Sequence, residues 1–268
     1  MKNGELLIIG GSERKDRETE ILDKFIELSQ ANEGAIGVLP TASQIPDQVG
    51  TQYVDIFQRL GAKEVKIIDV DSREKAESRD INDLVSTLSA FFITGGSQKR
   101  LADLIGGTKL SSTLYKKWTN GMVIAGTSAG ASIMGEQIIF SLSAEEDDEG
   151  VEVAMDNGFG YLKNTIIDQH FSQRARLDRL LKMIAKNRKT IGIGIDENTA
   201  ILVKDDQFEV LGEHQVIVID GHDRTYIDTR VSNEGTTEPV MTNVQLHTLT
   251  KGYQFDLSTR KLLNGKEE

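Results

Sequence analysis

Cysteine is absent from the 268 residues of the chain. Its absence excludes disulfide bonds, thiolate metal ligands and a cysteine nucleophile, and therefore also an amidotransferase glutaminase. Long apolar runs are missing too, since none approaches the roughly 20 residues that a membrane-spanning helix needs. The first apolar run, residues 6–9, is too short for the core of a signal peptide, so we expect a cytoplasmic protein with no membrane partner.

Basic residues are outnumbered by acidic ones, 31 to 42, which gives a formal net charge of −11. A nucleic-acid backbone is bound by clustered Lys and Arg, so this balance argues against a nucleic-acid partner. The surplus of carboxylates can attract a cationic substrate, although a gain in solubility explains the charge equally well. The sequence contains no cluster of metal ligands, and we expect neither a metal nor an organic cofactor.

Short apolar runs alternate with helical stretches through the first two-thirds of the chain. Buried strands are predicted at 6–9, 36–39, 65–70, 90–94 and 122–126, where turn-forming residues bound each run. The intervening helices are predicted at 18–30, 47–60, 81–88, 98–104 and 112–120. This alternation is typical of an α/β protein with a mostly parallel, doubly wound sheet.

The last third has a different pattern. A helix is predicted over 173–187, and short strands with tight turns follow at 190–195, 200–204, 207–211 and 215–219. Antiparallel strands at one edge of the sheet fit these short segments best. No linker rich in Pro, Gly or Ser divides the chain, so we predict a single α/β domain over residues 1–268.

A candidate nucleophile lies in the string Gly126-Thr127-Ser128-Ala129-Gly130, which matches G-x-S-x-G. An apolar strand leads into it and a helix of small residues follows, as a nucleophile elbow requires. At the start of that helix the Ala129 backbone N–H can face a developing oxyanion. A plain Gly/Ser turn between strand and helix is the alternative, and the strand–turn–helix context favours Ser128 as the nucleophile.

A serine nucleophile needs a base, and the chain has only four histidines, His170, His214, His222 and His247. His170 follows a predicted strand at 164–167 and precedes a helix. Ligands of open α/β sheets bind at the carboxyl ends of strands, which favours His170 as the base. The other three histidines are better explained by packing or solvent exposure.

The acid that orients the imidazole is predicted by the same criterion, a position at the carboxyl end of a strand. Glu197 directly follows the strand predicted at 190–195, so it also lies at a strand's carboxyl end. The alternative acid is Glu146, in the acidic run at 145–149. A run of charges is usually a solvated loop, so Glu197 is preferred.

Two further features accompany these residues. The string Thr94-Gly95-Gly96 can turn backbone N–H groups inward, and we expect Gly96 to be the second oxyanion donor, although a plain glycine turn explains it as well. Arg174, Arg176 and Arg179 lie near the start of a predicted helix, where cations oppose the helix dipole. They are expected to clamp substrate carboxylates, or else to form a solvated face paired with Asp178.

These strings together resemble the cyanophycinase family, from the Gly10-Gly11 turn to about residue 220. The resemblance rests on Thr94-Gly95-Gly96-Ser97-Gln98, on Gly126-Thr127-Ser128-Ala129-Gly130-Ala131, on the block from Asp168-Gln169-His170-Phe171 through Arg174, Arg176 and Arg179, and on Gly192-Ile193-Gly194-Ile195-Asp196-Glu197. The block with three arginines is the specific signal, because many hydrolases share G-x-S-x-G.

The resemblance implies a three-layer α/β/α sandwich like class I glutamine amidotransferases and aspartyl dipeptidase, usually dimeric. It implies a serine exopeptidase that cleaves cyanophycin, a polyaspartate with arginine on each side chain, into β-Asp-Arg dipeptides without a cofactor. Ser128, His170 and Glu197 match the family's triad. The substrate groove is implied to be lined by Gln98, Asp168, Gln169, Arg174, Arg176 and Arg179.

Two rival functions compete with this one. The nearest is an α-aspartyl or isoaspartyl dipeptidase on the same scaffold. A rival of another class is a non-catalytic binding protein, which would not be inactivated by a serine-directed reagent.

Overall fold

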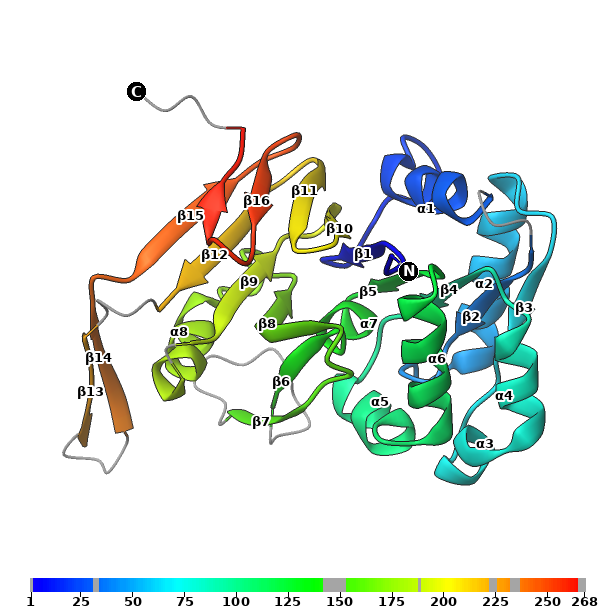
Figure 1. Ribbon diagram of the computed structural model, residues 1–268, viewed down its shortest axis with the longest axis horizontal. Coiled ribbons are helices and arrows are strands. Elements are labelled where there is room, and N and C mark those ends of the chain that lie inside the picture. The colour runs from blue at the N-terminus through cyan, green and yellow to red at the C-terminus, as the bar shows by residue number, and fades with distance from the viewer. Residues whose placement is uncertain are drawn as a thin grey trace.

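The predicted strands form two large sheets rather than one (Figure 1). The computed structural model describes residues 2–30, 34–141, 153–187, 189–221, 226–231 and 237–264. The first sheet has nine strands in the order β17-β16-β11-β10-β1-β5-β4-β2-β3. Its parallel part consists of β1 (Leu6–Ile9), β5 (Val123–Thr127), β4 (Ala90–Ile93), β2 (Ile36–Leu39) and β3 (Val65–Ile67). Its antiparallel part consists of β10 (Thr199–Lys204), β11 (Gln207–Gly212), β16 (Gln254–Asp256) and β17 (Lys261–Leu262).

The second sheet has six strands in the order β15-β12-β9-β8-β6-β7. They are β15 (Gln245–Leu249), β12 (Val216–Asp220), β9 (Ile191–Ile195), β8 (Leu162–Gln169), β6 (Gly135–Ser141) and β7 (Val153–Asn157). The prediction of one sheet was therefore wrong, because an apolar run identifies a strand but not the partner with which it pairs. A separate hairpin of β13 (Tyr226–Val231) and β14 (Thr237–Thr242) projects at the left of Figure 1.

Helices cover both faces of the parallel strands, because side chains alternate along each strand. On one face Leu7 and Ile9 of β1 join the core formed by α1 (Glu20–Gln30) and α2 (Pro46–Arg59). On the other face Leu6 and Ile8 join a core with residues of α3 (Arg73–Glu77), α4 (Arg79–Ser86), α5 (Gln98–Ile105) and α6 (Lys109–Thr119). Strands that are buried on both faces explain why the runs are continuously apolar.

The second sheet shares that larger core with the first. Ile193 of β9 and Val218 of β12 belong to the same buried cluster as Ile201 and Val210 of the first sheet. The opposite face of the second sheet packs on α8 (Leu177–Lys186).

Glycines in β9 make this second contact possible. A Cβ on Gly192 would lie 2.5 Å from the Cδ1 atom of Ile184 in α8, and a Cβ on Gly194 would lie 2.4 Å from the ring of Phe171. The alternation of glycine and isoleucine in β9 thus admits a helix and an aromatic ring on one face and fills the core on the other.

Most predicted elements are confirmed with ends that differ by a few residues. The helix predicted over 173–187 begins only at Leu177, because residues 171–176 form turns after β8. The short helix α3, the strands β6 and β7 and the strands after residue 220 were not predicted. Glu146 with its acidic run and His222 lie outside the described residues. Among the helices that are described, none is long and apolar enough to cross a membrane.

Candidate active site

Ser128 occupies a sharp turn between β5 and the short helix α7 (Ala129–Ser132). Its backbone has φ +53° and ψ −115°, a conformation that is strained for a residue with a Cβ. The neighbouring glycines permit the turn. A Cβ on Gly126 would lie 2.2 Å from the carbonyl oxygen of Gly130, and a Cβ on Gly130 would lie 2.2 Å from that of Ile93. The G-x-S-x-G string therefore forms the predicted elbow.

His170 follows β8 and meets Ser128 although the two residues come from different sheets. The distance from His170 Nε2 to Ser128 Oγ is 3.1 Å. The imidazole lies against Gly11, where a Cβ would be only 2.4 Å from His170 Cε1. The turn after β1 therefore leaves the space that the ring occupies.

Glu197 completes a continuous chain of hydrogen bonds. It follows β9, and its Oε1 atom lies 2.6 Å from His170 Nδ1. Its backbone N–H donates to the side-chain oxygen of Gln173 at 3.1 Å, which fixes the turn that carries it. A carboxylate at this nitrogen holds the tautomer in which Nε2 can accept the serine proton.

Burial and charge both act on the two titratable members. Desolvation lowers the pKa of His170 from its ordinary value, and Arg174 and Arg176 lower it further, while the bond to Glu197 opposes the shift. For Glu197, partial burial acts to raise the pKa, but hydrogen bonds with His170 and Ser12 outweigh it and lower the pKa. The imidazole is thereby kept neutral, as a base must be, beside an ionised carboxylate.

Two backbone donors lie beside the serine. A Cβ on Gly95 would lie 3.2 Å from Ser128 Cβ, so the Thr94-Gly95-Gly96 turn contacts the nucleophile candidate. Gly96 has φ +138° and approaches the carbonyl of Ala42 so closely that a Cβ there would be 2.1 Å away. Within the described part of the chain, the N–H groups of Gly96 and Ala129 donate to no other residue.

Asp168 and two of the arginines have a different environment from the one expected. Asp168 is 1% exposed and accepts hydrogen bonds from Arg179 Nε at 2.7 Å and from Arg176 Nη1 at 3.3 Å. Arg176 is also buried and donates to the carbonyl of Gln169 at 2.6 Å. Their charges neutralise one another inside the protein and tie the end of β8 to the start of α8, and their lining of a substrate groove stays a prediction.

The alternative interpretation of the arginines pairs them with Asp178. Asp178, expected to pair with them, instead pairs with Lys182 on α8, at 3.0 Å. Arg174 is exposed and acts electrostatically on both His170 and Glu197. Of the three arginines, Arg174 is the exposed one.

Both predicted glutamines lie in the interior. Gln169 is 4% exposed, and its Oε1 atom lies 3.2 Å from Ser128 Oγ, so it competes with His170 Nε2 for the single hydroxyl proton. Gln98 is also buried and donates to the carbonyl of Ile139, while its own Oε1 atom has no partner among the described residues.

Ser12, Glu13 and Gln173 were not predicted as part of the site. Glu13 is 3% exposed and accepts a hydrogen bond from Thr127, the residue before the serine, at 2.6 Å. The Gly10-Gly11 pair directly after the first strand was the sequence signal for this segment.

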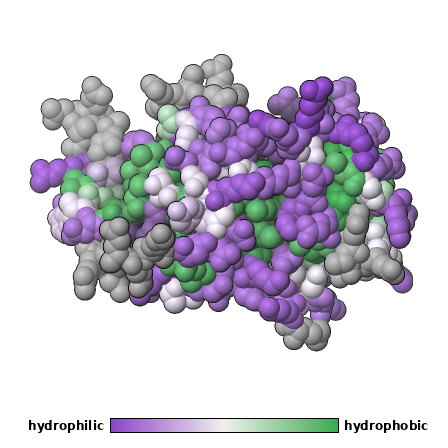
Figure 2. Space-filling view, turned by 90° about the horizontal axis from the view of Figure 1, so that it is seen from above, coloured by the Kyte–Doolittle hydropathy of each residue, from purple (hydrophilic) through white to green (hydrophobic). Residues whose placement is uncertain are grey.

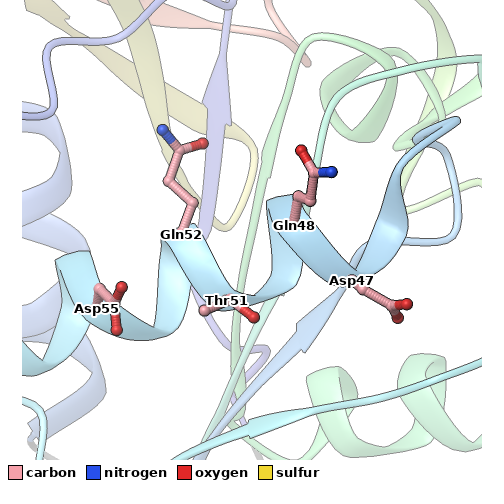
Figure 3. A pocket seen from close by; sticks show the side chains of 5 residues that line it. All are labelled: Asp47, Gln48, Thr51, Gln52 and Asp55. Atoms are coloured by element: carbon pink, nitrogen blue, oxygen red, sulfur yellow. The ribbon is translucent and has the colours of Figure 1, made fainter.

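Pockets also lie away from the serine. One of about 460 Å³ follows the outer face of α2, where Gln48 and Gln52 project to the same side of the helix (Figure 3). Another, of about 340 Å³, is lined by Asp196 and Glu213 among others and adjoins the turn that carries Glu197. Neither pocket is lined by Ser128 or His170.

A serine hydroxyl, an imidazole and a carboxylate joined in this order at a strained elbow define the class of serine hydrolases. The sequence model of peptidase family S51 matches residues 6–211, and the chain belongs to this family. It is a serine peptidase.

Relatives and solved structures agree with this assignment. The cyanophycinase of Geminocystis herdmanii is 36% identical over 263 residues, which cover 97% of this chain and 96% of the relative. The cyanophycinase of Trichormus variabilis is 35% identical over 96% of this chain and 87% of its own length. The crystal structure of a peptidase from an acI-B1 actinobacterium has a similar fold, with a TM-score of 0.73, 24% identity, and coverage of 95% of this chain and 97% of that one.

Proposed function

We propose that the chain hydrolyses cyanophycin to β-Asp-Arg dipeptides with Ser128, His170 and Glu197 as its catalytic triad. The observation that carries the proposal is the unbroken hydrogen-bond chain from Ser128 Oγ to Glu197, with distances of 3.1 and 2.6 Å. The substrate is suggested by relatives named cyanophycinase that align over nearly the whole chain.

In the proposed reaction Ser128 Oγ attacks the scissile carbonyl while His170 Nε2 takes its proton. The oxyanion accepts hydrogen bonds from the backbone N–H groups of Gly96 and Ala129. His170, oriented by Glu197, then protonates the leaving amine and the acyl-enzyme forms. Water, deprotonated by the same imidazole, hydrolyses this ester and regenerates the serine. No metal or organic cofactor takes part in these steps.

Each unit of cyanophycin presents a carboxylate and a guanidinium. The site offers a cationic side chain that can bind the carboxylate. The exposed Arg174 supports recognition of a carboxylate beside the triad. Gln98 and Gln169 offer amide groups close to the elbow. We propose an indirect role for the ion cluster of Asp168, Arg176 and Arg179. The cluster holds the end of β8 that carries Gln169 and His170.

Two features of the whole molecule extend the proposal. Helices on both faces of β1–β5 support a three-layer arrangement like that of class I glutamine amidotransferases.

A cytoplasmic homodimer is proposed as well. In its support, Tyr226 of the projecting hairpin and Leu246 of β15 are each more than half exposed. Hydrophilic side chains dominate the face in Figure 2, where apolar ones form separate patches.

The test is to incubate the purified protein with cyanophycin and to identify the products by mass. We expect β-Asp-Arg dipeptides, and faster turnover of cyanophycin than of α-aspartyl or isoaspartyl dipeptides. Ser128→Ala and His170→Ala should abolish turnover while the fold survives. Faster turnover of the dipeptides would make the protein a dipeptidase. Full activity of Ser128→Ala would exclude the serine mechanism.

The acid is tested by a pair of variants. Glu197→Gln should lower kcat by about 10⁴-fold, as in other triads that lose their acid, whereas Glu146→Gln should retain activity. The reverse result would assign the acid to Glu146.

A further inference from the structure

The segment from Ile9 to Glu13, which ends β1 and begins the loop after it, contacts every part of the proposed triad. Three consecutive carbonyl oxygens accept hydrogen bonds from backbone N–H groups of the site: Ile9 from Ser128 at 3.0 Å, Gly10 from His170 at 2.8 Å and Gly11 from Asn198 at 2.9 Å. The Ser12 side chain acts on Glu197, whose pKa it helps to lower. One short stretch of backbone therefore sets the relative positions of residues that two separate sheets supply.

The backbone of this segment is held in uncommon conformations. Gly11 has φ +100° and Ser12 has φ +49°, both in the region that side chains disfavour. Conformations of this kind persist only where surrounding contacts over-determine them. The segment must therefore be anchored at its far end.

Glu13 provides that anchor. Its carboxylate is buried, and each oxygen accepts a hydrogen bond from a different element: Oε2 from the Thr127 hydroxyl at 2.6 Å and Oε1 from the Tyr53 hydroxyl of α2. Lys15 Nζ lies 3.2 Å from Oε1 and supplies the balancing charge. Burial and the neighbouring Glu13 carboxylate raise the pKa of Tyr53, which therefore stays a neutral donor.

The bond to Thr127 has a particular consequence, because Thr127 directly precedes Ser128. The strand end and the strained elbow are adjacent, so a fixed Thr127 hydroxyl restricts the position of the serine. Glu13 makes no hydrogen bond to His170 and is shielded from solvent, so it has no direct route to the substrate.

We propose that Glu13 is a positioning residue for catalysis, which holds the segment Ile9–Glu13 and the nucleophile elbow in register through Thr127. This inference rests on the proposed role of Ser128. It assigns no chemical step to Glu13.

The test compares a variant that breaks one bond of Glu13 with a variant that changes the Glu13 carboxylate itself. Thr127→Val removes the hydroxyl at nearly constant shape, and Glu13→Gln replaces the charged acceptor. Each should lower kcat on cyanophycin by about 10- to 100-fold, the size of effect that small displacements of reacting groups produce. KM should change little, because no substrate contact is removed. The double variant should be no slower than the slower single variant, because both changes break the same bond.

Two matched variants separate positioning from general stability. Thr127→Ser keeps the hydroxyl and should retain most of kcat. Tyr53→Phe removes the other bond of the same carboxylate and should lower the melting temperature, with a smaller loss of kcat than Thr127→Val. Should Glu13→Gln fail to fold, the comparison of Thr127→Val with Thr127→Ser still decides the question.

The inference is overturned if folded Thr127→Val retains wild-type kcat, or if Thr127→Ser and Tyr53→Phe lose as much kcat as Thr127→Val. An active Ser128→Ala variant would instead remove the proposed function on which the inference rests. The two failures are therefore distinguishable in one set of assays.

Discussion

At the scale of single residues, strain and close approach concentrate around the triad. Ser128 and His170 both have positive φ, of 53° and 48°, although neither is glycine. Strained residues of this kind cluster at functional sites, where the surrounding structure holds them. Here the compensating contacts are the hydrogen bonds from their own backbone N–H groups to the carbonyls of Ile9 and Gly10.

The electrostatic setting of His170 predicts the pH dependence. Burial and nearby arginines lower its pKa, so the imidazole stays neutral below its ordinary pKa of 6.5. The rate at which phenylmethylsulfonyl fluoride sulfonylates Ser128 should therefore fall only below that pH. Arg174→Gln removes a cation that disfavours the imidazolium, so the pKa should rise and the fall should begin at higher pH.

A small neutral reagent is chosen because Arg174 is also proposed to bind substrate. Arg79→Gln serves as the control, since Arg79 is an exposed residue of α4 that pairs with Asp83. A shift to lower pH in Arg174→Gln, or an equal shift in both variants, would contradict the electrostatic account.

Gly11 predicts a large effect from a single methyl group. In Gly11→Ala the new Cβ would lie 2.4 Å from His170 Cε1, so the ring must move away from Ser128. Activity on cyanophycin should fall by about 100-fold or more. Gly121 is the matched control, because its φ of +99° is nearly that of Gly11 but nothing lies within 4 Å of its Cβ position. Gly121→Ala should lose about 1 kcal/mol of unfolding free energy and keep its activity. Equal activity in the two variants would show that the imidazole does not depend on this contact.

At the scale of elements, the buried charges connect β8 to α8. Asp168 accepts hydrogen bonds from both Arg176 and Arg179, at the point where β8 ends and the turns toward α8 begin. Asp168 is two residues before His170, so these hydrogen bonds hold the strand end that carries the proposed base. This ion cluster is a structural support for the base, and its removal should act on stability first.

Asp168→Asn should lower the free energy of unfolding by about 3–5 kcal/mol, because it leaves two buried or partly buried cations without their partner. Urea unfolding measures the change. Asp83→Asn breaks the exposed Arg79–Asp83 pair and should leave stability nearly unchanged. If Asp168→Asn raised KM strongly at unchanged stability, the carboxylate would be a substrate contact, as the sequence had suggested.

The same residues show what the sequence could predict. The elbow at Ser128 and the placement of His170 and Glu197 at strand ends follow from local patterns, and their meeting within hydrogen-bond distance agrees with them. Burial of Asp168 did not follow, because its neutralising partners lie 8 and 11 positions further along and a charged string is normally exposed.

The pairing of strands into sheets could not be predicted from the sequence either. Ile166 and Ile167 of β8 are both buried, each in a different core, so their pattern says only that the strand is covered on both sides. Nothing in such a run distinguishes a neighbour in the first sheet from one in the second. Pairing of strands distant in sequence is decided by the packing of the whole chain.

At the scale of the whole molecule, the site depends on the contact between the two sheets. The first sheet supplies Ser128 and the second supplies His170, while Glu197 lies on the turn from β9 to β10, which joins them. Because one buried cluster spans both sheets, separation of the sheets would expose much of the core. We therefore expect one cooperative unit.

Urea denaturation tests this expectation, and with it the single domain predicted from the sequence. Far-UV circular dichroism, tryptophan fluorescence from Trp118 and residual activity should follow one coincident transition. Loss of activity at clearly lower urea, with the other two signals unchanged, would show that the sheets separate before the chain unfolds.

The central claim, that Ser128 attacks the substrate, is tested most directly by locating the acyl group. Cyanophycin is mixed with the enzyme, the reaction is quenched in acid within milliseconds, and the protein is analysed by peptide mass mapping. We predict an aspartyl ester on Ser128 in the wild type, no ester in Ser128→Ala, and little ester on this time scale in Glu197→Gln, in which the ester forms slowly as well. An adduct on another residue, or turnover in Ser128→Ala, would contradict the account.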